Sequence, residues 1–359
     1  MHAPLAEPLL EDLRTLMESG AFSNGPQVAA FEDAFARYVG TEHCVGVSSG
    51  LDALRLALLA LDPKPGDEVL VPAHTFAATF EAIVQAGAIP VPVDVSEADY
   101  QLDVDAAASC IGPRTIAVMP VHLYGQMVDM VRLGELCRRH GLAVIEDACQ
   151  AHGAERDGVR AGSAGTAAAF SFYPTKNLGA MGDAGALTTD DAGVAASVRL
   201  LREHGQASKY EHARSGYTAR LDTVQALVLL RKLPLLDAWN DERRRLAASY
   251  VEGLTGVGDL RMPPVPQGSR PVWHLFVVRT AALEELQAFL ADRGIATGRH
   301  YPQPPHTSEA FADLGHPPGS FPVTEALAAE LLSLPIYPGL GESQLNDVVA
   351  AVSAFFDDA

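Results

Sequence analysis

Short apolar runs recur along the first half of the chain, and most of them end in small or polar residues. Within a run the residues do not alternate between apolar and polar, which is the pattern of strands buried on both faces of a parallel sheet. The sequence predicts strands at residues 44–47, 69–72, 89–95, 115–121, 142–145, 167–172 and 184–188.

Segments with apolar residues at helical spacing separate these runs. The first covers residues 28–38, and others follow strands at 50–61, 77–86 and 130–140. Strands that are linked by helices favour an α/β fold, because the helices cover both faces of the sheet. We therefore predict a mostly parallel mixed sheet flanked by helices.

The pattern changes in the last third of the chain. Residues 221–254 have helical spacing that is bent or broken at Pro234. A connector rich in Gly and Pro follows at 256–271. A strand at 273–279 and helices at 283–293 and 344–356 complete the chain. This predicts a smaller C-terminal α+β domain, with a division into residues 1–240 and 241–359.

Composition narrows the class of protein. The 359 residues are 48% hydrophobic and carry a net charge of −19, which argues against a nucleic-acid surface. No apolar run is long enough to span a membrane, and the N-terminus lacks the features of a secretory signal. Four scattered cysteines indicate a reduced, cytoplasmic protein. No metal-binding motif is present, so we predict no metal.

Three residues suggest the chemistry. Lys176 lies in the segment Ser-Phe-Tyr-Pro-Thr-Lys-Asn, and Ser171 begins that segment. Asp147 ends an apolar run upstream, and Glu146 beside it should face the other side of that strand, because neighbouring strand residues alternate. A lysine can form a Schiff base with pyridoxal phosphate, a carboxylate can hold its pyridine nitrogen protonated, and a serine can bind its phosphate. The alternative for Lys176 is a solvated loop lysine, but its flanking residues favour the cofactor.

Other candidates follow strands at the same edge of the predicted sheet, where ligands bind to open α/β folds. A helix beginning at Gly50 can bind a phosphate or can simply be capped by its serines. Phe76 can stack on a cofactor ring or belong to the core. Gln150 can contact the cofactor or be a surface amide. His300 and Tyr301 precede a Pro-rich loop that can close over a ligand or be structural.

The sequence resembles the DegT/DnrJ/EryC1/StrS family of nucleotide-sugar aminotransferases, which have fold type I and use pyridoxal phosphate. The resemblance covers nearly the whole chain. Its motifs lie at residues 23–26, 66–68, 120–125, 146–148, 171–185, 220–222, 273–274, 300–302 and 334–335. The form of residues 171–177, with Pro-Val-His-Leu-Tyr-Gly upstream, is most similar to the branch that aminates dTDP-linked 3-keto-6-deoxy sugars.

The resemblance implies a role for each candidate. Lys176 carries the cofactor and later shuttles a proton, and Asp147 pairs with the pyridine nitrogen. The remaining cofactor contacts that it implies are Gln150 at the phenolic oxygen, Phe76 on the ring, and Ser171 and the amides of Gly50, Leu51 and Asp52 at the phosphate. Arg220 is the candidate for a contact to the phosphate in the partner's site. The substrate-side residues are Tyr173, Lys209, His300 and Tyr301. Glutamate is the expected amino donor.

Family members are dimers with shared active sites, so we expect residues 209–220 to reach the partner's site. Two residues depart from the family pattern: Leu51 stands where Thr is common, and Thr218 where Asn is common. Both lie near the expected phosphate position, but neither removes a reacting group.

Three other functions stay open. A 4-keto-sugar aminotransferase differs only in the position of the ketone. A sugar dehydratase of the same family has histidine in place of the lysine, so Lys176 argues against it. A non-catalytic regulator is disfavoured by the Lys176 and Asp147 pair and by the acidic charge.

Overall fold

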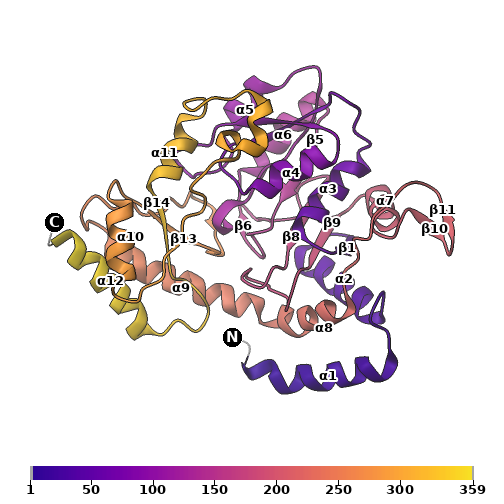
Figure 1. The fold of residues 1–359 in the computed structure, drawn as a ribbon, viewed down its shortest axis with the longest axis horizontal. Coiled ribbons are helices and arrows are strands. Elements are labelled where there is room, and N and C mark those ends of the chain that lie inside the picture. Colours follow the sequence, from indigo (N-terminus) through magenta and orange to yellow (C-terminus); the bar gives the residue numbers. More distant parts are fainter. Residues whose placement is uncertain (1–2, 358–359) are drawn as a thin grey trace.

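The computed structural model describes residues 3–357. Its centre is a seven-stranded sheet with helices on both faces (Figure 1). In spatial order the strands are β1 (His43–Val47), β9 (Gly185–Thr189), β8 (Ala167–Ser171), β5 (Ala143–Asp147), β4 (Thr115–Val118), β2 (Glu68–Pro72) and β3 (Ile89–Val93). Only β9 runs antiparallel to its neighbours, so the predicted mostly parallel mixed sheet is confirmed.

Side-chain alternation along each strand divides the core into two layers. On β2, Leu70 packs into one apolar cluster, and Val69 and Val71 pack into the other. The first layer is covered by α2 (Pro26–Val39), α5 (Val104–Cys110), α6 (Met130–His140) and α8 (Thr223–Lys232). The second is covered by α3 (Gly50–Ala60), α4 (Ala77–Gln85) and α7 (Ala192–Arg202).

The C-terminal part has a core of its own. An antiparallel pair, β13 (Phe276–Arg279) and β14 (Leu331–Leu334), packs with α10 (Leu283–Ala291), α12 (Glu342–Asp357) and the later turns of α9 (Leu236–Leu254). Helix α11 (Pro322–Glu330) leads into β14. This is the expected α+β arrangement.

Helix α9 joins the two parts. It follows α8 after a single 3-10 turn at Leu233–Leu235, so the predicted break at Pro234 is confirmed. Leu236 at its start belongs to the core of the sheet, whereas Leu246 and Tyr250 belong to the C-terminal core. The division at residue 240 stays a prediction, and that residue lies inside the helix.

Several elements were not predicted from the sequence. Helix α1 (Ala6–Ser19) precedes residue 28, where we expected the first element, and only Leu9 and Leu16 on it are buried. Helices α5, α7 and α11 and strand β14 were also missed. The Pro-rich loop after Tyr301 contains two 3-10 helices, Pro305–Thr307 and Glu309–Leu314.

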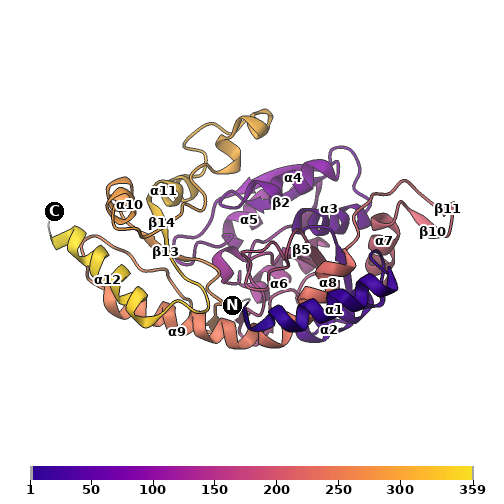
Figure 2. The ribbon, with the colours of Figure 1, turned by 60° about the horizontal axis from the view of Figure 1, so that its bottom comes forward.

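Two small sheets lie outside the main one. Strands β6 (Glu155–Arg156), β7 (Val159–Arg160) and β12 (Ser269–Arg270) form one of them. The other is a hairpin of β10 (Gln206–Ser208) and β11 (Glu211–His212), which extends away from the body of the molecule (Figures 1 and 2). Its tip residue Tyr210 is 80% exposed.

Candidate active site

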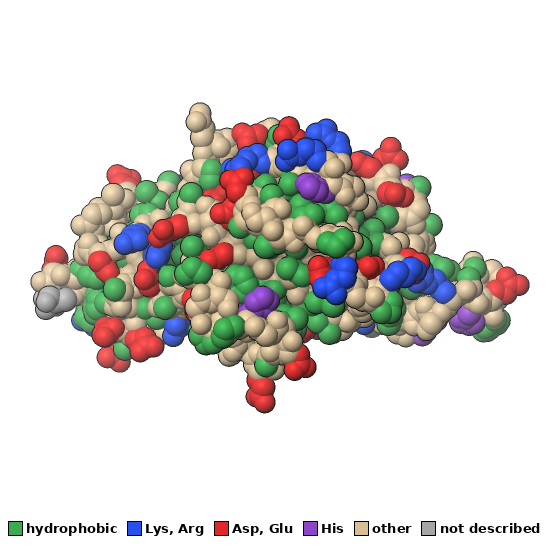
Figure 3. All heavy atoms as spheres, turned by 90° about the horizontal axis from the view of Figure 1, so that it is seen from above, with side chains coloured by type: hydrophobic (Ala, Val, Ile, Leu, Met, Phe, Trp, Pro, Cys, Tyr) green, Lys and Arg blue, Asp and Glu red, His purple; other side chains and the backbone are tan. Residues whose placement is uncertain are grey.

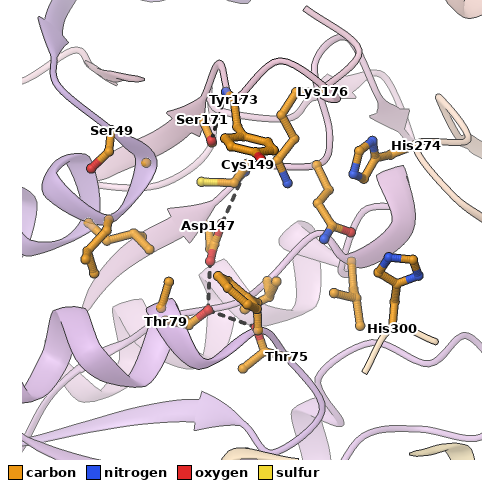
Figure 4. A pocket seen from close by; sticks show the side chains of 18 of the residues that line it. Ser49, Thr75, Thr79, Asp147, Cys149, Ser171, Tyr173, Lys176, His274 and His300 are labelled. Atoms are coloured by element: carbon orange, nitrogen blue, oxygen red, sulfur yellow. Dashed lines mark hydrogen bonds between the residues drawn. The ribbon is translucent and has the colours of Figure 1, made fainter. Parts of the chain in front are cut away.

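A cavity of about 390 Å³ lies at the carboxyl ends of the central strands. Its walls come from the start of α3, the loops after β2, β5 and β8, and the segments around residues 274 and 300. The lining residues are Ser49, Gly50, Leu51, Leu54, Thr75, Phe76, Ala78, Thr79, Val121, Leu123, Asp147, Cys149, Gln150, Ser171, Tyr173, Thr175, Lys176, His274, His300 and Tyr301. Figure 4 shows side chains from these segments converging on one space.

Asp147 is the last residue of β5, and its carboxyl group reaches the cavity. The residue is only 6% exposed. The hydroxyl of Thr79 donates to Oδ2 at 2.9 Å, and the amide of Cys149 donates to Oδ1 at 3.1 Å. These two bonds fix the carboxylate's direction and leave it free to accept from a cation or donor in the cavity (Figure 4).

Glu146, beside Asp147, faces the opposite side of the strand, as we expected from side-chain alternation. It is completely buried and accepts from His122 Nε2 at 2.8 Å. The amides of Gly162, Ala164 and Gly165 donate to the same carboxylate at 2.7 to 2.9 Å. Glu146 and His122 therefore hold the loop before β8 and do not line the cavity.

Lys176 lies in the loop after β8, where a tight turn carries it inward. Its amide donates to the carbonyl of Tyr173 at 2.8 Å. A Cβ atom at Gly179 would meet the carbonyl oxygen of Pro174 at 2.4 Å, so glycine is required to close the turn. Burial lowers the pKa of the Lys176 amine, although Cys149 and Asp147 raise it in part.

The start of α3 forms one end of the cavity. Ser49 caps the helix by accepting from the amide of Asp52 at 3.1 Å. The amides of Gly50 and Leu51, as the first two of the helix, have no partner within it and can bind an anion. A side chain at Gly50 would clash with Cys149 and Ser171, so the helix start sits close against the ends of β5 and β8.

Gln150, Tyr301 and His300 lie together at the opposite end. Nε2 of Gln150 donates to the hydroxyl of Tyr301 at 3.1 Å, and its Oε1 accepts from the amide of Tyr124 at 2.7 Å. The hydroxyl of Tyr124 donates to the carbonyl of His300 at 2.5 Å. Since that hydroxyl has one proton, Nε2 of His74, 2.6 Å away, must be the donor to it.

Two aromatic residues line the wall between these ends. The ring of Phe76 lies 5.1 Å from that of Tyr301 and is half exposed. Tyr173 is exposed to a similar degree. Both flank the space beside Lys176 and Asp147, which is where a flat ring would be held.

A family model for the DegT/DnrJ/EryC1/StrS aminotransferase family matches residues 5–353. This chain belongs to that family. EryC1, the erythromycin biosynthesis sensory transduction protein of Saccharopolyspora erythraea, is 49% identical over 341 residues, with 95% of this chain and 93% of EryC1 covered. The dTDP-3-amino-3,4,6-trideoxy-alpha-D-glucose transaminase of Streptomyces venezuelae is 48% identical, with coverage of 94% and 89%.

Solved structures agree with the fold. The crystal structure of DesV from S. venezuelae has a TM-score of 0.97 with this chain at 46% identity, covering 99% of this chain and 96% of DesV. NtdA from Bacillus subtilis, with bound PMP, has a TM-score of 0.91 at 29% identity, with coverage of 99% and 82%. The chain is a sugar aminotransferase of this family, and the prediction of pyridoxal phosphate as cofactor is confirmed.

The cavity fits this cofactor. It offers a buried amine with a lowered pKa at Lys176, an oriented carboxylate at Asp147 and unpaired helix-start amides at Gly50 and Leu51. Ser171 lines the same end as those amides. The cavity therefore offers a group of suitable chemistry for the aldehyde, for the ring nitrogen and for the phosphate of the cofactor.

Three predicted site residues do not line the cavity. The amide of Asp52 is bonded to Ser49, and its carboxylate pairs with Arg55. Arg220 lies opposite Val47, at the end of β1, but its guanidinium pairs with Glu203 at 2.9 Å. Lys209 lies on the protruding hairpin, near the ring of Tyr210. Their assigned roles stay predictions.

The structure also adds residues that sequence analysis missed. Thr75 and Thr79 lie one helical turn apart, and their hydroxyls are 2.8 Å from each other. Two threonines four residues apart, next to Phe76, could have been recognised in the sequence as candidates for the site. Cys149 and His274 are contributed by loops. His274 belongs to the family motif at residues 273–274 but was not assigned to the site, and Cys149 had no sequence pattern that pointed to the cavity.

Other classes of site find no support. Among residues 3–357 no cluster of His, Cys, Asp and Glu could hold a metal ion. Within the same residues, no helix has both the length and the apolar character needed to cross a membrane. On the face seen in Figure 3, basic side chains are interleaved with acidic ones and do not form the continuous basic surface that nucleic acid requires.

Proposed function

We propose that this aminotransferase transfers an amino group from glutamate to carbon 3 of a dTDP-linked 3-keto-6-deoxyhexose. The observation that carries the proposal is the buried Lys176 amine in one cavity with the oriented carboxylate of Asp147. The substrate class is supported by the 48% identical relative, which is a transaminase for a dTDP-3-amino sugar.

Bound pyridoxal phosphate supplies an aldehyde that takes up an amino group and a ring that withdraws electrons. Lys176 would hold the aldehyde end and would move a proton beside it. Because burial lowers its pKa, a larger share of the amine is unprotonated at neutral pH than for an exposed lysine. The same group can therefore accept and return a proton.

Asp147 would hold the ring nitrogen in its protonated form. The bonds from Thr79 and Cys149 keep both carboxylate oxygens in place for this contact. Gly50, Leu51 and Ser171 would bind the phosphate. With Leu51 in place of threonine, the site loses a hydroxyl, but the backbone donors remain.

His300, Tyr301 and Tyr173 form the wall on which we place the sugar. Their polar groups can bond to sugar hydroxyls. The bonds that Tyr124 and Gln150 make to this segment hold it at the mouth of the cavity, so the sugar-binding groups have a fixed position.

We further propose a dimer with shared sites. The described lining contains one lysine, one aspartate and no arginine. Three anions must nevertheless be bound: the cofactor phosphate, the donor carboxylates and the nucleotide diphosphate. The segment 209–220 carries Lys209, His212, Arg214 and Arg220 against a single acid, and its hairpin projects from the body. A partner's hairpin would supply the missing positive charge.

The four cysteines form no disulfide among the described residues, which fits the reducing cytoplasm that we infer. A 4-keto sugar is the main alternative substrate, because the cavity residues alone do not select the ketone position. A dehydratase is disfavoured by Lys176. A purely regulatory role is disfavoured by an intact set of cofactor-binding groups.

A panel of nucleotide keto-sugars, incubated with glutamate and read by mass, tests the substrate. We expect faster amination of dTDP-3-keto-6-deoxyhexose than of its 4-keto isomer. Parallel reactions with UDP sugars and with other amino acids as donors test the nucleotide and glutamate. Faster turnover of the 4-keto isomer would overturn the position of the ketone, and no amination of any member would overturn the function.

A further inference from the structure

His274 is a cavity residue that the reaction described above does not use. It precedes β13, is 8% exposed and lines the same cavity as Lys176 (Figure 4). Nδ1 lies 3.2 Å from Oδ1 of Asn177, the residue after Lys176. What the ring presents to the cavity depends on which of its nitrogens carries the proton.

The side-chain amide of Asn177 determines which ring nitrogen of His274 carries the proton, because that amide can adopt only one orientation. Its Nδ2 lies 2.9 Å from the backbone carbonyl of Val272, which can only accept a hydrogen bond. Nδ2 must therefore point there, and Oδ1 must point towards His274. An oxygen that cannot donate requires a proton on Nδ1 of His274.

The side-chain amide of Asn240 supports the same orientation of the Asn177 side chain. Nδ2 of Asn177 also donates to Oδ1 of Asn240 at 2.9 Å, and Nδ2 of Asn240 donates to the carbonyl of His152 at 2.8 Å. Both asparagines are buried. Two backbone carbonyls, at Val272 and His152, thus fix a chain of bonds in which every donor points away from His274 except its own Nδ1–H.

We propose that His274 is a positioning residue for Lys176. The chain of amides holds the ring as the Nδ1–H tautomer, and its unprotonated Nε2 accepts a hydrogen bond from the ε-amino group whenever that group is released from the cofactor. The accepted bond keeps the amine close to the reacting carbon between the two halves of the reaction. This inference rests on the proposed aminotransferase function.

The surrounding charges favour this arrangement. Burial lowers the pKa of His274 well below its ordinary value, and Lys176 and Arg243 lower it further. The ring therefore stays neutral beside the lysine. Asp147 and Cys149 also face the amine, and the buried ring of His152 and the half-buried ring of His300 lie near enough for it to lower their pKa.

The tautomer can be measured without any activity. We expect ¹⁵N NMR of histidine-labelled holoenzyme to show one ring, assigned by its loss in His274→Gln, with a protonated Nδ1 and an unprotonated Nε2. In Asn177→Leu that preference should disappear. Observation of the Nε2–H tautomer, or of an imidazolium at neutral pH, in the unchanged protein would overturn the proposal.

The bond to Lys176 has its own test. In enzyme loaded with pyridoxamine phosphate the lysine is free, and its acetylation rate by a limiting amount of acetic anhydride can be followed by mass. Removing the acceptor that stabilises the ammonium form should lower the pKa of Lys176. At a pH below that pKa, Lys176 should therefore be acetylated about tenfold faster in His274→Phe than in the unchanged enzyme. His274→Gln, which keeps an acceptor, should label nearly as slowly as the unchanged enzyme.

His306→Phe is a matched control, since His306 is a buried histidine outside the cavity that lies 3.2 Å from Glu325. Its lysine labelling should not change. An unchanged rate in His274→Phe would overturn the assignment to Lys176. If that variant slowed only amination of the sugar, Nε2 would instead face a sugar hydroxyl, and the aminotransferase function would still stand.

Discussion

Two neighbouring acids on β5 have different roles because their surroundings differ. Asp147 has two donors and an open side towards the cavity. Glu146 has four donors and no exposure. Sequence analysis separated them by strand alternation alone, which located the functional acid but could not reveal the partners of the other. Those partners come from His122 and from the loop at residues 162–165, which only the fold brings together.

Lys176→Ala should abolish covalent attachment of the cofactor and nearly abolish amination, because no other amine lines the cavity among the described residues. Borohydride reduction of the unchanged enzyme, followed by peptide mapping, should place the cofactor on Lys176. A label on any other lysine contradicts the assignment. Lys64→Ala, at an exposed lysine, is a suitable control.

Glu146→Gln should destabilise the fold by roughly 2–4 kcal/mol, since an amide nitrogen would face groups that can only donate. Burial opposes ionisation of Glu146, but His122 and the amides of Gly162 and Ala164 outweigh it and lower the pKa. A lowered pKa means that the stabilisation is complete above the ordinary glutamate range and is lost as pH falls.

As pH falls, the free energy of unfolding of Glu146→Gln should therefore decrease less than that of the unchanged protein. Urea titrations between pH 3 and 7 can measure this difference. Glu155→Gln changes a half-exposed acid paired with Arg160 and should cost less than about 1 kcal/mol. Equal effects of the two substitutions would contradict the argument.

At the scale of elements, apolar runs predicted every strand of the main sheet and the break at Pro234. Helix α1 was missed because it buries only Leu9 and Leu16. Strand β14 was missed because its four buried residues are too few to distinguish from the end of a helix. The cavity's Thr79 and His274 were missed because their importance arises from contacts between elements distant in sequence.

One such contact joins the loop after β4 to the segment at residue 300. Tyr124→Phe removes the hydroxyl that bridges His74 and the carbonyl of His300. The segment should lose its fixed position, so we expect amination of the sugar to fall about tenfold, for a cost near 1.4 kcal/mol. The glutamate half-reaction, followed by absorbance, should change much less.

Tyr301→Phe should likewise slow amination of the sugar more than the glutamate half-reaction if its hydroxyl binds the sugar. Tyr337→Phe, at a half-exposed residue, should change neither half-reaction. Equal losses in both halves for Tyr124→Phe would mean that Tyr124 supports the cofactor site rather than the sugar wall.

At the scale of the whole molecule, the hairpin of β10 and β11 is the feature without a partner in the single chain. An exposed Tyr210 at the end of a projecting arm is typical of a contact surface. If segment 209–220, which begins on this arm and ends at Arg220, completes a neighbour's site, inactive Lys176→Ala and inactive Arg220→Ala subunits should regain activity when mixed. Purified heterodimers without activity would contradict shared sites, while pairs of the same variant serve as controls.

Helix α9 has a consequence for recombining this chain with its relatives. Because the helix places Leu236 in one core and Tyr250 in the other, a crossover at residue 240 would join half-helices from two parents. The junction would also fall at Asn240 itself, whose side chain donates to the carbonyl of His152 in the first part of the chain. A crossover in the irregular stretch after Leu254 transfers the helix intact. Chimeras made there should keep both cores sound, while His300 and Tyr301 of the sugar wall come from one parent and Tyr173 comes from the other.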